Sequence, residues 1–172
     1  MTSRCWRAGM GSYCGYVFAD ESGFGTLWLM PQTTDFSGKT YIAIVQCHIV
    51  MERCPGFFCE RSFHGRTGGF AGLAKEKMYR VVHITCGGCC GRAMHRKLAL
   101  LTQKALKFDE ISSSQILVKF ASCITKESHH GSKCPHLDYL VNLVDKLGLD
   151  YSFDTHLSAK AEERRAEGLY GE

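Results

Sequence analysis

The chain has 172 residues, enough for one domain with a buried core, and its 45% hydrophobic and 22% charged content is ordinary for a globular protein. This composition disfavours a disordered chain. The formal charge of +4 comes from basic residues that are dispersed among acids, so a solvated surface explains it better than a nucleic-acid track does. We therefore expect no nucleic-acid partner.

Ten cysteines set the chain apart. In a small secreted protein they would indicate disulfides, but Gly9, Gly11, Asp20 and Glu21 interrupt any apolar segment long enough for a signal peptide. No window approaches the ~18 uninterrupted apolar residues of a membrane span, so we expect no membrane partner. We therefore expect a cytoplasmic, reduced protein whose clustered thiols are metal ligands or redox groups.

Residues 1–38 contain many glycine and aromatic residues without a sustained period, and we interpret them as a peripheral N-terminal extension. The two cysteines in this segment, Cys5 and Cys14, are taken as incidental thiols. From residue 39 the pattern becomes regular. A continuous apolar run predicts a buried strand at 41–45, and this strand ends at Cys47.

The next segment contains a predicted helix and a second predicted strand. Pro55, directly after Cys54, is placed for the first turn of a helix that ends at Gly65 and includes Cys59. A short amphipathic piece at 70–77 then leads into a strand at 79–84, which ends at Cys86.

A long amphipathic helix follows at 92–107. Its apolar stripe consists of Met94, Leu98, Leu101 and Ala105, at helical spacing against a basic outer face. The third strand is predicted at 116–121, and Cys123 comes soon after it.

The last part of the domain repeats this order. Pro135, directly after Cys134, predicts the start of another helix, with Gly148 as its stop signal. A fourth strand at 149–155 is followed by His156. We take 39–156 as the domain and 157–172 as a charged helical C-terminal tail.

Strands that alternate with helices predict an α/β fold, an open parallel sheet of about four or more strands with helices on both faces, as in Rossmann-like or flavodoxin-like three-layer sandwiches. The carboxyl ends of all the strands then lie at one edge. Cys47, Cys86, Cys123 and His156 each occupy the exit of a different strand, so we expect them to converge where such sheets bind ligands.

The segment 85–91, with the sequence TCGGCCG, lies between a predicted strand and a predicted helix. This position puts the sulfurs of Cys86 and Cys89 near a helix N-terminus, where the dipole and free N–H groups stabilise thiolate. Thiolates bind metals or react as nucleophiles, and the spacing alone does not separate these two roles.

These motifs together resemble the CGGC-domain family of cysteine- and histidine-rich proteins, over roughly residues 39–156. The resemblance rests on Cys47, Cys54-Pro55 with Cys59, Cys86-Gly-Gly-Cys89, the segment 121–125, Cys134-Pro135 and Thr155-His156. It implies metal binding, with zinc proposed from the cysteines and histidines, and leaves the biochemical role unassigned. Family members usually have proline after the tetrapeptide, where this chain has Cys90, which either adds a ligand or replaces a helix-starting residue.

Eight donors are candidates for metal ligands: Cys47, Cys54, Cys59, Cys86, Cys89, Cys123, Cys134 and His156. They would fill two tetrahedral zinc sites, one of four thiolates and one of three thiolates with the imidazole. Such loading would also reduce the formal charge to about +1. An iron–sulfur cluster, used in electron transfer or redox sensing, takes the same soft ligands and is the alternative cofactor.

If the four donors at the strand exits share one metal, Cys54, Cys59 and Cys134 remain for a second site or a redox pair. His48 and His136 are candidates for a role behind the ligands, and we interpret His129 and His130 as part of a polar loop.

Two classes of function therefore remain open. The first is a metal-binding protein that acts as a sensor, a carrier or a structural module. The second is a thiol oxidoreductase in which Cys86 attacks and Cys89 resolves, although such a pair needs two thiols and leaves the others unexplained. The sequence assigns no catalytic residue and no protein partner, and enzymatic activity is left open.

Overall fold

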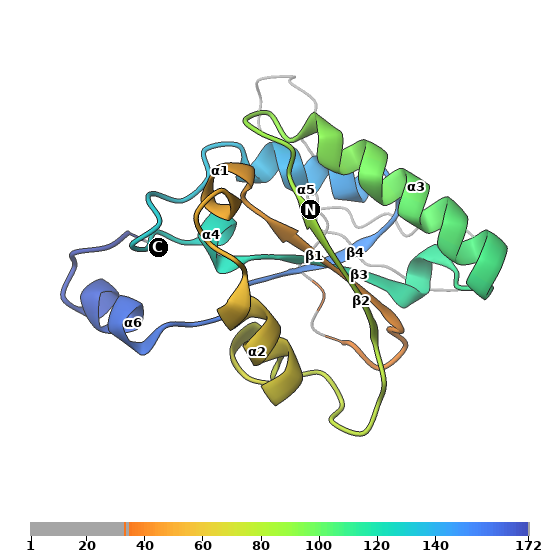
Figure 1. Ribbon diagram of the computed structural model, residues 1–172, viewed down its shortest axis with the longest axis horizontal. Helices are drawn as coiled ribbons and strands as arrows, with labels where there is room; N and C mark the ends of the chain where they lie inside the picture. Colours follow the sequence, from red (N-terminus) through yellow and green to blue (C-terminus); the bar gives the residue numbers. More distant parts are fainter. Residues whose placement is uncertain (1–32, 34, 172) are drawn as a thin grey trace, which may run out of the picture.

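The computed structural model describes residue 33 and residues 35–171 and contains one parallel four-stranded sheet with the order β2-β1-β3-β4 (Figure 1). The strands are β1 (Tyr41–Gln46), β2 (Arg80–Thr85), β3 (Ile116–Phe120) and β4 (Asp150–Phe153). Tyr41 lies opposite Arg80 on one side and Ile116 on the other, so the three strands start level with one another. The predicted α/β fold with a parallel sheet is confirmed.

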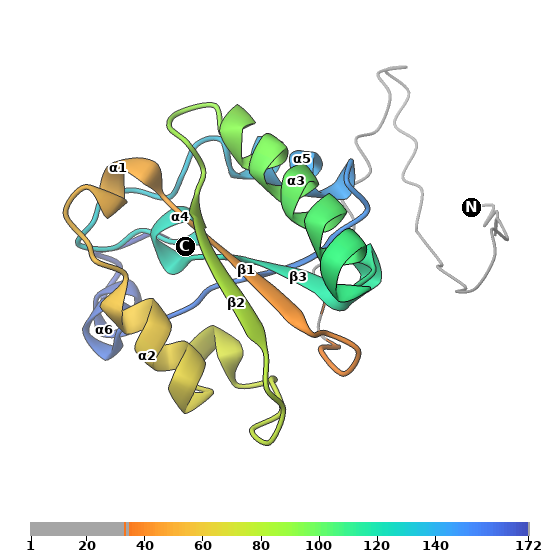
Figure 2. The same cartoon turned by 45° about the vertical axis from the view of Figure 1, so that its right-hand side comes forward.

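Helices cover both faces of this sheet (Figure 2). The long helix α3 (Arg92–Asp109) and α5 (Leu137–Asp145) lie on one face, and α2 (Phe57–Gly65) with the 3₁₀ turn η1 (Gly68–Phe70) lies on the other. The remaining elements are α1 (His48–Met51), η2 (Ser113–Gln115), α4 (Ser122–Thr125) and α6 (Ala159–Ala166).

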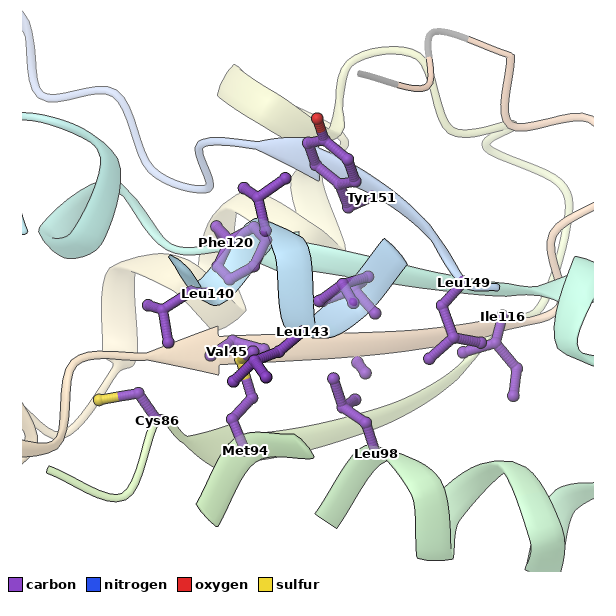
Figure 3. Close-up of a cluster of buried hydrophobic side chains, with 14 of the residues drawn as sticks. Val45, Cys86, Met94, Leu98, Ile116, Phe120, Leu140, Leu143, Leu149 and Tyr151 are labelled. Atoms are coloured by element: carbon purple, nitrogen blue, oxygen red, sulfur yellow. The ribbon is translucent and has the colours of Figure 1, made fainter. Parts of the chain in front are cut away.

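The alternation of side chains along the strands produces two hydrophobic clusters. On β1, Ala43 and Val45 point into the larger cluster with α3 and α5, whereas Ile42 and Ile44 pack with Phe63 of α2. Figure 3 shows the larger cluster, in which Cys86 lies at the end near the carboxyl ends of the strands. The larger cluster therefore extends to the edge of the sheet where Cys86 lies.

Two predicted helix starts are wrong. Pro55 and Pro135 both lie before their helices, because Gly56 at φ 74° precedes α2 and His136 precedes α5. Neither proline therefore lies in the first turn of its helix. The predicted piece at 70–77 contains no helix beyond η1, and the four-residue helices α1 and α4 were not predicted.

The chain leaves β1 for β2 on one side and later for β3 on the other side of β1. The switch point of the sheet therefore lies between the carboxyl ends of β1 and β3, where open α/β sheets bind ligands. Both short helices, α1 and α4, begin directly after these two strands. We therefore expect a ligand site at the segments that follow Gln46 and Phe120.

Within the described part of the chain, all eight cysteines are free thiols. No helix in that part is long and apolar enough to cross a membrane. The end of the predicted N-terminal extension contacts the domain, because Phe36 packs against the smaller cluster and the Thr33 amide donates to the Tyr151 carbonyl at 2.8 Å. Cys5 and Cys14 lie outside the described residues.

Lys119 on β3 is a charged side chain inside the fold, with only 2% of its surface exposed. Its Nζ donates to Ser152 Oγ and to the Phe153 carbonyl, both at 2.8 Å. Burial lowers the pKa of Lys119 to about 8, and the nearby Asp154 carboxylate offsets part of this effect. The folded chain therefore binds this proton less tightly than the unfolded chain does.

Replacing Lys119 by methionine should change how the free energy of unfolding depends on pH. An ordinary lysine keeps its proton up to about pH 10.5, so between the two pKa values the unfolded wild type binds more protons than the folded one, and its stability rises with pH. Relative to Lys119→Met, the wild type should gain about 1–3 kcal/mol between about pH 7.5 and pH 10. Urea unfolding of both chains at these two pH values measures the gain, and parallel curves would contradict it.

Candidate metal centre

Six cysteines line one cavity at the carboxyl edge of the sheet, with a volume of about 210 Å³. We call it the first cavity. The cysteines come from four separate segments: the exit of β1, the loop after β2, α4, and the segment before α5 (Figure 1). They are Cys47, Cys86, Cys89, Cys90, Cys123 and Cys134. Thiols from distant parts of the sequence thus meet in one place.

The loop between β2 and α3 has an unusual backbone. Gly87, Gly88, Cys90 and Gly91 all have positive φ angles, between 62° and 99°. Cys90, at φ 94°, is therefore in a conformation that proline cannot adopt. Since α3 begins at Arg92, Cys90 does not replace a helix-starting residue here, and its exposed side chain lines the cavity.

Backbone N–H groups after β1 point at two of the sulfurs. The Cys47 amide donates to Cys123 Sγ at 3.5 Å, and the His48 amide donates to Cys86 Sγ at 3.4 Å. Both amides belong to the turn that leads into α1. Hydrogen bonds of this kind stabilise negative charge on sulfur, whether the thiolate is free or bound to a metal.

Burial works in the opposite direction. It raises the pKa of Cys123 to about 12; the hydrogen bond from the Cys47 amide acts against this rise, and the neighbouring cysteines Cys59, Cys47 and Cys54 add to it. Burial likewise raises the pKa of Cys134, with smaller contributions from Cys86, Cys47 and Cys89. A cluster of this kind cannot hold several thiolates without a cation among them, and a bound cation would displace their protons.

The other three predicted ligands line a neighbouring, larger cavity of about 570 Å³, which we call the second cavity. Cys54, Cys59 and His156 belong to it. Cys59 Sγ lies 3.1 Å from Thr155 Oγ1, and His156 Nδ1 lies 3.2 Å from Ser62 Oγ. The His156 ring also stacks on Phe58, with the ring centroids 4.8 Å apart. Its Nε2 is therefore the nitrogen without a protein partner among these contacts.

The structure thus divides the eight candidates between two cavities. Cys47, Cys86, Cys89 and Cys134 line the first, whereas Cys54, Cys59 and His156 line the second. Cys123 lines both, so its thiol lies in the wall between them. The three cysteines at strand exits meet in the first cavity, and His156, the fourth donor at a strand exit, lies in the other one.

Among residues 33 and 35–171, no three Cys, His, Asp or Glu side chains lie in an arrangement that could hold a metal ion. The candidate donors line common cavities, but their side chains do not form a preassembled site. Cys89 is exposed and follows two glycines with positive φ angles. The candidate donors of the first cavity are all soft sulfur, which fits zinc or an iron–sulfur cluster.

Several lining residues were not predicted as part of a site. His130 lines both cavities, although its polar loop was interpreted as a surface feature. Its proximity in sequence to Cys134 was the only available signal. Arg53, Lys126 and Arg165 of the second cavity had no signal at all, since single basic residues are ordinary on a surface.

The sequence was compared with models of known protein families. The family model of the CGGC domain matches residues 41–156, which includes all eight candidate ligands. Searches of curated proteins and of solved structures found no match. The match covers well over half of the chain, so the chain belongs to the CGGC-domain family, and this membership suggests a metal-binding role.

Proposed function

We propose that this protein binds zinc in the first cavity through Cys47, Cys86, Cys89 and Cys134, with the Cys123 thiol beside them. One observation carries the proposal: cysteines from four separate segments line a single cavity of about 210 Å³. Structural zinc takes about four such donors, and a reduced cytoplasmic compartment would keep them as thiols. A second ion held by Cys54, Cys59 and His156 stays a prediction.

The exposure of Cys89 bears on the role of the ion. Cys86 is 8% exposed and lies in the core, whereas Cys89 is exposed beside solvent. An ion between them would be open on one side, which supports exchange with a partner, as in a sensor or a carrier, over a purely structural role.

Purification without exposure to air, followed by elemental analysis and a visible spectrum, tests the metal. We expect a colourless protein with at least one zinc ion per chain. A brown protein with iron and sulfide would instead identify the iron–sulfur alternative, which needs the same four thiolates. A protein that contains neither metal would contradict the proposal.

The thiol oxidoreductase remains the alternative outside metal binding. The burial of Cys86 speaks against it as the attacking group, because an attacking thiolate must reach its substrate. Metal-free protein that still cycles Cys86 and Cys89 against a dithiol reductant would favour the oxidoreductase and remove both metal proposals.

A further inference from the structure

The second cavity has more than donors for a metal. Its charged lining residues are Arg53, Lys126 and Arg165, and three histidines, His129, His130 and His156, also line it. No Asp or Glu in residues 33 and 35–171 lines this cavity. A concave site with cations and without carboxylates concentrates anions, because its low-dielectric walls focus the positive potential.

Acidic residues outside the cavity partly neutralise the charges of Lys126 and Arg165, the two cations near α6. Lys126 Nζ lies 3.4 Å from Asp154 Oδ2, and Arg165 Nη2 lies 2.8 Å from Glu162 Oε1. These two carboxylates line a different depression on the surface. Arg53 has no ion pair among the described residues, and its Nη2 donates only to the His130 carbonyl, at 2.6 Å. Arg53 is therefore the cation with most charge to offer a ligand.

Another wall of the same cavity is apolar. Met51, Pro55, Phe57 and Phe58 line it, and the two phenylalanines are 56% and 53% exposed. The rings touch edge to face, with their centroids 5.3 Å apart. Large aromatic side chains left open at the mouth of a cavity gain free energy when a ligand covers them.

We propose that the second cavity binds a small organic anion that has an apolar or aromatic part. Arg53 would hold the anionic group, and Phe57 and Phe58 would cover the apolar part. The volume of about 570 Å³ and the position beside the switch point of the sheet are those of small-molecule sites in open α/β folds. Arg53, His130 and Cys123 also line the first cavity, so the two sites share part of their walls.

A pair of fluorescent probes separates the contribution of the anionic group to binding from the contribution of the aromatic rings. 8-Anilinonaphthalene-1-sulfonate has the anion and the aromatic rings, and N-phenyl-1-naphthylamine has the rings alone. We expect the full chain, with the metal it carries when purified, to bind the sulfonate at one site and at least about tenfold more tightly than the neutral probe. Equal affinity for the two probes would overturn the proposal.

Arg53→Gln should weaken sulfonate binding about tenfold and leave the neutral probe unchanged, because only the charge-assisted hydrogen bond is lost. Arg96→Gln, at an exposed position of α3, makes the same change in net charge away from the cavity and should have no effect. Arg53→Lys should retain most of the affinity. If Arg53→Gln and Arg96→Gln behave alike, the proposal fails.

A separate substitution tests the apolar wall of the second cavity. Phe58→Ala should weaken both probes severalfold, whereas Phe108→Ala, a 70% exposed phenylalanine on α3, should weaken neither. Amide chemical shifts should move around Phe58 and Ser158, which line only the second of these two cavities, when the sulfonate is added, and shifts confined to α3 would place the probe elsewhere. Zinc content is measured in every variant, so a failure of this site is distinguished from a failure of the metal site.

Discussion

Cys86→Ser should lose the metal of the first cavity. Serine keeps the shape of the side chain but replaces a soft thiolate with a hydroxyl that remains protonated, so one of about four zinc bonds disappears. We expect the affinity for zinc to fall by more than about a hundredfold. This is a larger loss than the one caused by substituting residues that contact the ligands but do not bind the metal. Elemental analysis after dialysis and competition with a chromophoric chelator measure this effect.

The same variant should lose the stabilisation that the metal provides. An ion that binds only the folded chain raises the midpoint of thermal unfolding, and a chelator removes this gain from the wild type. Cys86→Ser should unfold at the same temperature with and without the chelator. Cys5→Ser, outside the described residues, should behave like the wild type, and an equal loss of zinc in both variants would refute the proposed centre.

Gly91→Ala is expected to have the largest effect on folding. An added Cβ at this position would lie 1.9 Å from Leu140 Cδ2 and 3.3 Å from Leu140 Cγ. Leu140 is 1% exposed and packed in the larger cluster, so it cannot move aside without disturbing its neighbours. With the added strain of a left-handed backbone at φ 62°, we expect a loss of about 3 kcal/mol in the free energy of unfolding.

Gly148→Ala is the matched control, because Gly148 has the same φ of 62° and an added Cβ would meet nothing within 4 Å. It should cost only about 1 kcal/mol, the backbone part of the effect. Urea unfolding of the two variants therefore isolates the contact with Leu140. Equal losses would show that helix α5 can retreat from the loop, and the loop would then not be fixed by the core.

The sequence was sufficient to predict the sheet and its edge. The strand β1 is a buried, continuous apolar run, as expected of a central parallel strand, and each of the four strands is followed within three residues by a cysteine or histidine. The parallel arrangement then required all these residues to lie at one edge. The strand pattern could not predict on which side of the sheet each residue would lie, because a shift of one residue reverses the side.

The separation of His156 from the first cavity is the clearest example. The backbone after β4 continues past Asp154 at φ 64°, a left-handed conformation that no glycine marks in the sequence. The starts of the helices were missed for a related reason. Proline fixes its own φ, but Gly56 and His136 set where α2 and α5 begin.

The position of Cys123 in the wall between the cavities links whatever occupies them. A metal in the first cavity that binds the Cys123 sulfur makes this sulfur unavailable to an occupant of the second cavity. Conversely, an occupant of the second cavity that contacts the Cys123 sulfur makes it unavailable to the metal. Such competition is reciprocal by thermodynamic necessity: the factor by which an organic anion alters zinc affinity equals the factor by which zinc alters affinity for the anion. A single half-buried thiol would then make the affinity of the protein for one ligand depend on the concentration of the other.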